Sequence, residues 1–209
     1  FMNRDELKKL SKSLIQTFNF AAQESIRLYS EGLKIEIKAD ESPVSNGDLA
    51  VNKIICDKIK ELTPNIPIIS EETVDINLKN RDKIFWLIDP IDGTKEYIAG
   101  KDEYTLNAAL IIDKVPNLGL VGVPKKKRLF FSYGIGESYL IENNITVKNN
   151  CSKKTPKGTT IALSSIHGPP KEIIEILKKF NVTSVVNMAS SYKFCVIANG
   201  EFDIYAAKE

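Results

Sequence analysis

Between Pro64 and Lys148 the chain is a succession of short apolar segments separated only by turns. The segments are IPIIS, KIFWLID, YTLNAALIID, LGLVGV, RLFFSYG, SYLIE and ITVK. Their length and their content of β-branched and aromatic residues are typical of β-strands. Strands that follow one another without intervening helices usually pair with their neighbours in sequence, so this region predicts an antiparallel sheet.

Two amphipathic helices are predicted ahead of the sheet. Apolar residues recur at helical spacing from Asp5 to about Ser30, and again from about Gly47 to Leu62. We expect one face of the second helix to carry Leu49, Ile54, Ile55, Ile59 and Leu62. The segment KIEIKADESPVS between the helices predicts an extended stretch and a loop.

The pattern changes after Thr159. Strand TIALSS, a helix over 169–180, strand VTSVVN, a helix over 190–199 and strand FDIYAA alternate, which favours a parallel or mixed sheet covered by helices. A polar stretch at Lys153–Gly158 predicts a boundary between an N-terminal α+β domain, 1–157, and a C-terminal α/β domain, 158–209. This second unit is small for an independent core and ends directly after a strand, so we expect it to be incomplete at Glu209.

Charge and composition narrow the function classes. The 29 basic and 27 acidic residues are interspersed and give a net charge of +2, so the chain lacks the basic field of a nucleic-acid-binding protein. The basic run Lys125–Arg128 predicts a solvated turn. Cys56, Cys151 and Cys195 are odd in number and far apart, which indicates a reducing compartment. Without an apolar run long enough to span a bilayer or a signal-peptide pattern, the sequence predicts a cytoplasmic protein.

The segment FWLIDPIDGTKEYI ends an apolar strand in two carboxylates. Asp89 precedes a proline, which favours extended backbone, and Asp92 is expected in the turn that follows. Two carboxylates this close repel each other unless a cation neutralises them, and a hard divalent ion suits oxygen ligands such as these and the Ile91 carbonyl. A short helix starting after Gly93 and Thr94 would direct free backbone N–H groups to the same place, where they could hold a phosphate. The alternative is a structural Asx turn.

A second acidic pair, Glu71 and Glu72, ends the apolar segment IPIIS. If the 66–70 and 84–88 strands are neighbours, Glu71 lies beside Asp89 and Asp92. An exposed acidic turn is the alternative, but like charges gathered without a metal would be destabilising. Asp48 also has two interpretations, because Ser45 and Asp48 form the pattern of a helix capping box and Asp48 could equally be catalytic.

The segments SPVSNGD, LTPNIPIISEE, WLIDPIDGTKEYI, EYTLNAALI and SSYKFCVIANGEFDIY together resemble the inositol monophosphatase superfamily of metal-dependent, lithium-sensitive phosphatases. Asp-Pro-Ile-Asp-Gly-Thr is specific for the superfamily, and GTKEYI and SSYKFC resemble its bacterial CysQ-type 3'(2'),5'-bisphosphate nucleotidases. The resemblance implies an α+β fold, a layered α/β sandwich of the inositol monophosphatase and fructose-1,6-bisphosphatase type.

The resemblance also implies roles for individual residues. Two or three Mg²⁺ ions would be bound by Glu71, Asp89, Asp92 and the Ile91 carbonyl, with Glu71 counted among the catalytic residues. Asp48 and Thr94 would activate the attacking water, and the N–H groups of Gly93 and Thr94 would hold the scissile phosphate. Ser191 and Lys193 would meet a second phosphate of the substrate, although a helix N-cap and an ordinary surface lysine are the alternative.

The implied reaction is hydrolysis of the 3'-phosphate of adenosine 3',5'-bisphosphate to AMP and phosphate, in sulfur metabolism or phosphopantetheine transfer. Homodimers are usual among relatives, so a homodimer stays open. Family members carry a further metal-binding aspartate in a Trp-Asp-x-Ala-Ala motif after the segment that matches EFDIYAA, whereas the only tryptophan here is Trp86. The alternatives are an inositol monophosphatase-like or fructose bisphosphatase-like enzyme, a catalytically weak remnant that binds metal or nucleotide, and an interaction module.

Overall fold

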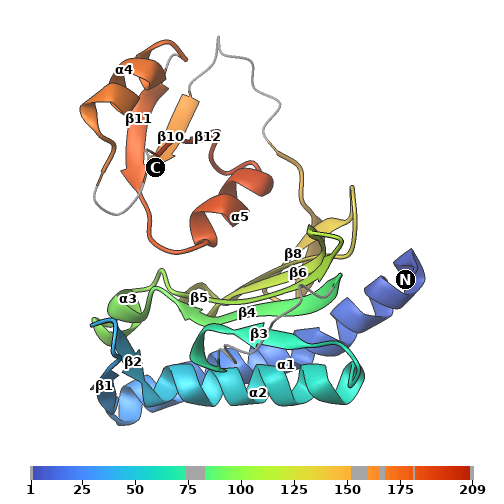
Figure 1. The fold of residues 1–209 in the computed structure, drawn as a ribbon. Coiled ribbons are helices and arrows are strands. Elements are labelled where there is room, and N and C mark those ends of the chain that lie inside the picture. Colours follow the sequence, from blue (N-terminus) through green and yellow to red (C-terminus); the bar gives the residue numbers. More distant parts are fainter. Residues whose placement is uncertain (1, 74–82, 152–159, 165–167, 181, 208–209) are drawn as a thin grey trace.

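The computed structural model describes residues 2–73, 83–151, 160–164, 168–180 and 182–207. Its centre is a seven-stranded sheet in the order β3-β4-β5-β6-β7-β8-β9. Helices lie on both faces of this sheet, and a smaller sheet stands beyond one of them (Figure 1). The strands are β3 (Ile68–Ser70), β4 (Ile84–Asp92), β5 (Thr105–Ile112), β6 (Val115–Val123), β7 (Arg128–Ser132), β8 (Ser138–Glu142) and β9 (Ile145–Lys148).

The large sheet is mixed. Every neighbouring pair from β4 to β9 is antiparallel, but β3 and β4 run parallel, with Ser70 opposite Ile88. The expected antiparallel pairing is therefore wrong at this edge, while the expected adjacency of the two strands is confirmed. Residues 71–83 separate β3 from β4, which is long enough for the crossover that a parallel pair requires.

Helices α1 (Arg4–Glu31) and α2 (Asn46–Leu62) pack side by side on one face of the sheet (Figure 1). The core between them and the sheet contains Leu14, Phe18, Ile55, Trp86 and Leu106, all essentially inaccessible to solvent. The indole Nε1 of Trp86 donates to Thr63 Oγ1 at 3.0 Å, so its polar atom is satisfied inside the core.

The buried stripe of α2 differs from the one expected. Val51, Ile55 and Ile59 are fully buried and follow one another at four-residue intervals. Leu49 lies two residues before Val51, about 200° around the helix, and is 48% exposed. Its expected place on the apolar face is therefore wrong.

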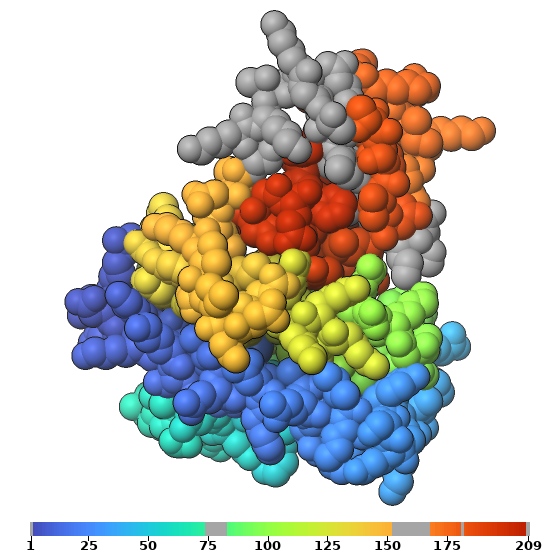
Figure 2. All heavy atoms as spheres, turned by 180° about the vertical axis from the view of Figure 1, so that it is seen from behind, coloured from blue at the N-terminus to red at the C-terminus, as the bar shows by residue number. Residues whose placement is uncertain are grey.

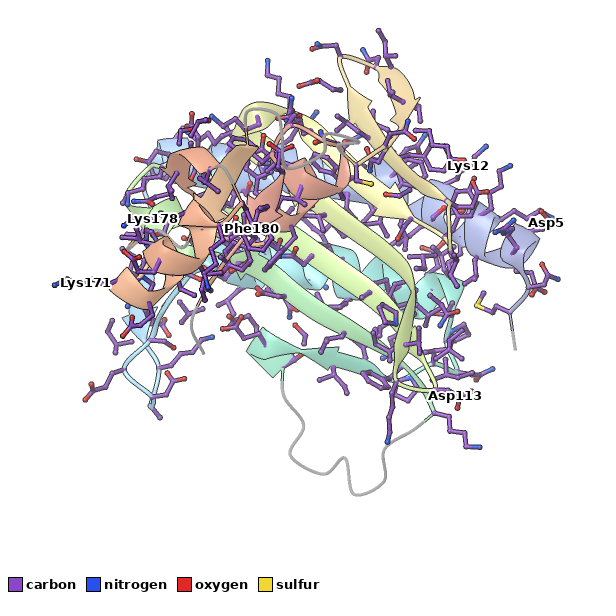
Figure 3. All side chains as sticks on the ribbon, turned by 90° about the horizontal axis from the view of Figure 1, so that it is seen from above. Asp5, Lys12, Asp113, Lys171, Lys178 and Phe180 are labelled. Carbon is purple, nitrogen blue, oxygen red and sulfur yellow. The ribbon has the colours of Figure 1, made fainter. Side chains whose placement is uncertain are left out.

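The C-terminal residues form a parallel three-stranded sheet, β11-β10-β12, as the alternating pattern predicted. Its elements are β10 (Thr160–Ser164), α4 (Lys171–Lys178), β11 (Val182–Asn187), α5 (Tyr192–Ala198) and β12 (Ile204–Tyr205). Seen from above, α4 with Lys171 and Lys178 lies on the opposite side of the molecule from Asp113 (Figure 3). The predicted boundary at 153–158 lies outside the described residues.

Helix α5 covers the second face of the large sheet. Val123, Phe130 and Leu140 of the sheet form a buried cluster with residues of the C-terminal part, namely Met188, Tyr192, Cys195 and Val196. From behind, the C-terminal residues rest against the later strands of the large sheet (Figure 2). With α1 and α2 on the other face, the molecule is the layered α/β sandwich that the sequence resemblance implied.

Arg128 strengthens this contact between the two parts. Its guanidinium pairs with Glu142 of β8 at 2.6 Å and with Glu201 after α5 at 2.7 Å, and it donates to the Tyr192 hydroxyl at 2.9 Å. The Arg128 side chain is only 17% exposed. The prediction of a solvated basic turn is therefore wrong for Arg128, which is the first residue of β7 rather than part of the turn.

Shorter elements surround one end of the sheet. They are the antiparallel hairpin of β1 (Ile35–Ile37) and β2 (Pro43–Ser45), the 3-10 turns η1 (Glu71–Thr73) and η2 (Pro124–Lys126), and helix α3 (Thr94–Ile98). None of the helices within the described ranges is long and apolar enough to cross a membrane.

Candidate active site

The end of β4 that carries Asp89 and Asp92 pairs with β5, and the register of this pairing shifts between the two aspartates. Asp89 pairs with Asn107 of β5 and Asp92 pairs with Thr105, with an irregularity between the two aspartates. Pro90 has no N–H to give to the ladder, which accounts for a shift at this point. Asp92 is the last residue of β4, so its expected place in the following turn is wrong. Both carboxylates are fixed by a strand and not by a free loop.

Asp89 carries the strongest sign of an ion-binding role. Its Oδ1 is buried and lacks a hydrogen-bond partner among the described residues. Burial, followed by the charges of Asp92 and Glu71, raises the pKa of Asp89 to about 8. A buried carboxylate with an unpartnered oxygen, beside other carboxylates, is costly unless a cation or proton neutralises it. This environment fits a hard divalent cation such as Mg²⁺, whose preferred ligands are oxygen atoms.

Asp92 has a hydrogen-bond donor and a nearby positive charge that offset its burial. Burial raises its pKa, while the N–H of Ser191 and the charge of Lys193 act in the opposite direction. The Ser191 N–H donates directly to Asp92 Oδ2. The C-terminal part thus contributes to the carboxylate site of the large sheet.

Glu71 lies where the neighbouring strands predicted. It follows Ser70 at the end of β3, opposite the segment of β4 that leads into Asp89, and it is close enough to raise the Asp89 pKa. Its side chain is half exposed and lies 3.4 Å from Lys38 Nζ. Within the described parts of the chain, no three His, Cys, Asp or Glu side chains are gathered as a ready-made metal site.

Asp48 and Thr94 meet as the resemblance implied. The Thr94 hydroxyl lies 3.0 Å from Asp48 Oδ1 and 3.2 Å from the Ile91 carbonyl oxygen. The other carboxylate oxygen of Asp48 accepts the N–H and hydroxyl of Ser45, whose side chain in turn caps α2. Asp48 therefore closes a capping box and contacts Thr94 at once. The capping interpretation is confirmed, and the catalytic role of Asp48 stays a prediction.

Gly93 begins α3 in a conformation that suits glycine. Its φ is +92° and it occupies the N-cap position, directly before Thr94. The first N–H groups of a helix have no partner within the helix. The predicted short helix after Gly93 is confirmed, and the binding of a phosphate by its first N–H groups stays a prediction.

Ser191 and Lys193 reach the same region from α5. The Ser191 hydroxyl donates to Asn107 Oδ1 at 2.6 Å and lies 2.9 Å from Thr105 Oγ1. Ser191 is at the N-cap of α5, but its side chain makes no capping bond. Lys193 Nζ donates to the Ser190 carbonyl at 2.7 Å and stands over the ring of Phe194. Ser191 therefore occupies the N-cap position of the alternative without the side-chain capping bond, and a role of Ser191 and Lys193 in binding a second phosphate stays a prediction.

Three residues near the site have no role in the sequence-based hypothesis. Thr105 and Asn107 bind Ser191, and Lys38 lies against Glu71 and Glu72. The alternating pattern of EYTLNAALI holds a signal for the first two, since it places two polar residues on a strand beside Asp89 and Asp92. Lys38 stands in a polar loop, and the sequence offers no partner for it.

Comparisons with known proteins show the family of the chain. The model of the inositol monophosphatase family matches residues 4–209. The chain is 34% identical over 169 residues to the Escherichia coli K12 3'(2'),5'-bisphosphate nucleotidase CysQ, covering 80% of this chain and 67% of that protein.

Solved structures show the same fold. The CysQ structure from Bacteroides thetaiotaomicron, a bacterial member of the inositol monophosphatase family, has a TM-score of 0.69 at 25% identity, over 94% of this chain and 79% of that one. An IMPase from Thermotoga maritima has a TM-score of 0.77 at 18% identity, over 96% and 76%.

Proposed function

Because the chain belongs to the inositol monophosphatase family, we propose that it is a magnesium-dependent phosphatase that hydrolyses the 3'-phosphate of adenosine 3',5'-bisphosphate. The phosphatase class follows from the family, and the nucleotide substrate is supported by the relatives named 3'(2'),5'-bisphosphate nucleotidase. The observation that carries the metal dependence is the unpartnered, buried Oδ1 of Asp89 beside other carboxylates.

The proposed magnesium site consists of Glu71, Asp89, Asp92 and the Ile91 carbonyl. When bound there, Mg²⁺ would lower the pKa of a coordinated water and neutralise the charge on the phosphate. Asp92 is oriented for such a role by the Ser191 N–H. Asp89 is held by the β4–β5 ladder, and its Oδ1 has no hydrogen-bond partner among the described residues.

Asp48 and Thr94 are proposed to prepare the attacking water. The Thr94 hydroxyl donates a hydrogen bond to Asp48 Oδ1. The lone pairs of Thr94 Oγ1 are therefore free to accept a hydrogen bond from the water. Asp48 is then the group that receives a proton through Thr94 as the water oxygen attacks phosphorus. As the bond between phosphorus and the ribose 3'-oxygen breaks, that oxygen takes a proton from solvent water and Asp48 returns its proton to solvent, which leaves AMP and inorganic phosphate.

The scissile phosphate is proposed to lie against the N–H groups of Gly93 and Thr94 at the start of α3. Ser191 and Lys193 are proposed to bind the second phosphate of the nucleotide. The positive charge of Lys193 is close enough to Asp92 to affect the pKa of that carboxyl, which puts it within reach of a ligand at the site.

An inositol phosphate is the second candidate substrate, since the fold is shared with an IMPase. The test is phosphate release from adenosine 3',5'-bisphosphate and from inositol 1-phosphate, each with Mg²⁺, with EDTA and with added lithium. The proposal expects lithium-sensitive, Mg²⁺-dependent release that favours the nucleotide. Preference for inositol 1-phosphate would replace the substrate assignment, and nucleotide binding without release would indicate a catalytically weak binding protein.

A further inference from the structure

Lys38 forms a bridge between the two glutamates that follow β3. Its Nζ lies 2.7 Å from Glu72 Oε1 and 3.4 Å from Glu71 Oε1. The lysine comes from the other side of the site, directly after β1, where its N–H is held by the Ser42 carbonyl at 2.8 Å. The hairpin therefore holds the base of this side chain while the ammonium group faces the acidic cluster.

The two glutamates differ in how firmly they hold the lysine. The Glu72 side chain is 5% exposed and the Glu71 side chain 51%. Lys38 compensates for the burial of Glu72, which otherwise faces the charges of Asp48 and Glu71. The closer, buried Glu72 is thus the anchor of the lysine, and Glu71 is the weaker and more accessible partner.

Glu71 is also a proposed magnesium ligand, and the two cations need the same carboxylate. We propose that Lys38 is a tethered cation that competes with Mg²⁺ for Glu71 and thereby lowers the affinity of the site for the metal. This inference rests on the proposed function, because it requires that the site binds Mg²⁺.

The flexible four-carbon stem of lysine makes such an exchange physically simple. When an ion takes Glu71, Lys38 keeps its shorter contact to Glu72 and loses only the longer one. In the absence of the ion, the same ammonium group reduces the repulsion among the carboxylates. Lys38 therefore stabilises the metal-free site and disfavours the binding of Mg²⁺ to it.

The test is titration of the folded chain with Mg²⁺ by isothermal calorimetry, without substrate. Lys38→Gln removes the charge but keeps a hydrogen-bond donor for Glu72. We expect its dissociation constant for Mg²⁺ to fall about fivefold, the factor that corresponds to an ion pair worth about 1 kcal/mol. The matched control is Lys53→Gln, which removes an exposed lysine paired with Asp57 on α2 and should leave the affinity unchanged.

Lys38→Arg keeps the charge and the partner of Glu72, so it tests the inference even where Lys38→Gln folds poorly. An arginine can hold a carboxylate through two donors, and we expect equal or weaker Mg²⁺ binding than in the wild type. Unchanged or weaker Mg²⁺ binding by folded Lys38→Gln, or tighter Mg²⁺ binding by Lys38→Arg, would overturn this inference and leave the proposed function standing. A wild type that binds no Mg²⁺ would overturn the proposed function and the inference with it.

Discussion

The hydroxyl of Thr94 contacts the carboxylate of Asp48 at 3.0 Å, although the two residues lie 46 positions apart. One stands at the start of α3 and the other in the first turn of α2, so two helix beginnings meet at this hydrogen bond. The carboxylate is buried and held on its other side by Ser45. Such a fixed pair can accept a proton at a defined position.

Thr94→Ala is expected to lower kcat by about 10² to 10⁴-fold, because the link between water and Asp48 is lost. The Mg²⁺ affinity should stay near the wild-type value, since Thr94 is not among the proposed ligands. Steady-state kinetics and Mg²⁺ titration check this together. Thr146→Ala, in the exposed strand β9, is the control. A kcat within about threefold of the wild type would contradict the role given to Thr94.

Asp89→Asn is expected to stabilise the metal-free protein while removing its response to magnesium. The folded-state pKa of Asp89 is raised from 3.8 to about 8, so the folded chain holds a proton that the unfolded chain releases in this range. Stability of the metal-free wild type should therefore fall as the pH rises from about 4 to about 8. Asn cannot ionise, so the variant avoids this loss of stability. At pH 8 it should be more stable than the metal-free wild type by roughly 1–3 kcal/mol.

Chemical denaturation at several pH values, with EDTA or with Mg²⁺, measures both effects. Magnesium should stabilise the wild type and leave Asp89→Asn unchanged. Asp113→Asn, in the turn between β5 and β6, should behave as the wild type does. Equal stabilisation of wild type and Asp89→Asn by Mg²⁺ would remove Asp89 from the metal site.

Gly47→Ala is expected to destabilise the fold and to disturb Asp48, the next residue. A Cβ at Gly47 would lie 2.4 Å from the Tyr97 hydroxyl oxygen, which itself donates to the Ser25 carbonyl at 2.6 Å in the core. The forced shift should cost about 1–3 kcal/mol. Gly119→Ala is the control, because its Cβ would find an ordinary contact with Ser132 at 3.5 Å. Equal melting temperatures for the two variants would contradict this account.

Lys193→Met is expected to raise KM for adenosine 3',5'-bisphosphate by about 10 to 100-fold, the loss of one charged hydrogen bond to the second phosphate. Hydrolysis of adenosine 3'-monophosphate, which lacks that phosphate, should change little. Lys178→Met on the exposed face of α4 is the control. An equal effect on both substrates would show that Lys193 acts on the structure of the site and not on the second phosphate.

The sequence predicted the relative positions of the candidate site residues better than the side chains that surround them. Glu71 and Asp89 could be placed together because each follows an apolar segment of the sequence, and the two segments form neighbouring strands. The position of Asp92 within β4 could not be foreseen, since it depends on a register shift that only the pairing with β5 defines.

The contacts of Ser191 with Thr105 and Asn107 join residues 84 to 86 positions apart, and they depend on α5 docking against the sheet. Hydrophobic periodicity predicts that α5 has a buried face, but it does not say where that face docks. The bridge from Lys38 to Glu71 and Glu72 is similar, because it requires the β1–β2 hairpin to stand opposite the end of β3. Local patterns therefore predicted the elements, while the side-chain partners came from their packing.

The most direct test of the central claim is to follow adenosine 3',5'-bisphosphate by ³¹P NMR in the presence of the chain, with Mg²⁺ and then with EDTA. The account predicts that inorganic phosphate and adenosine 5'-monophosphate form only with Mg²⁺, and that Asp89→Asn forms neither. Release of the 5'-phosphate, release in EDTA, or full activity of Asp89→Asn would contradict it.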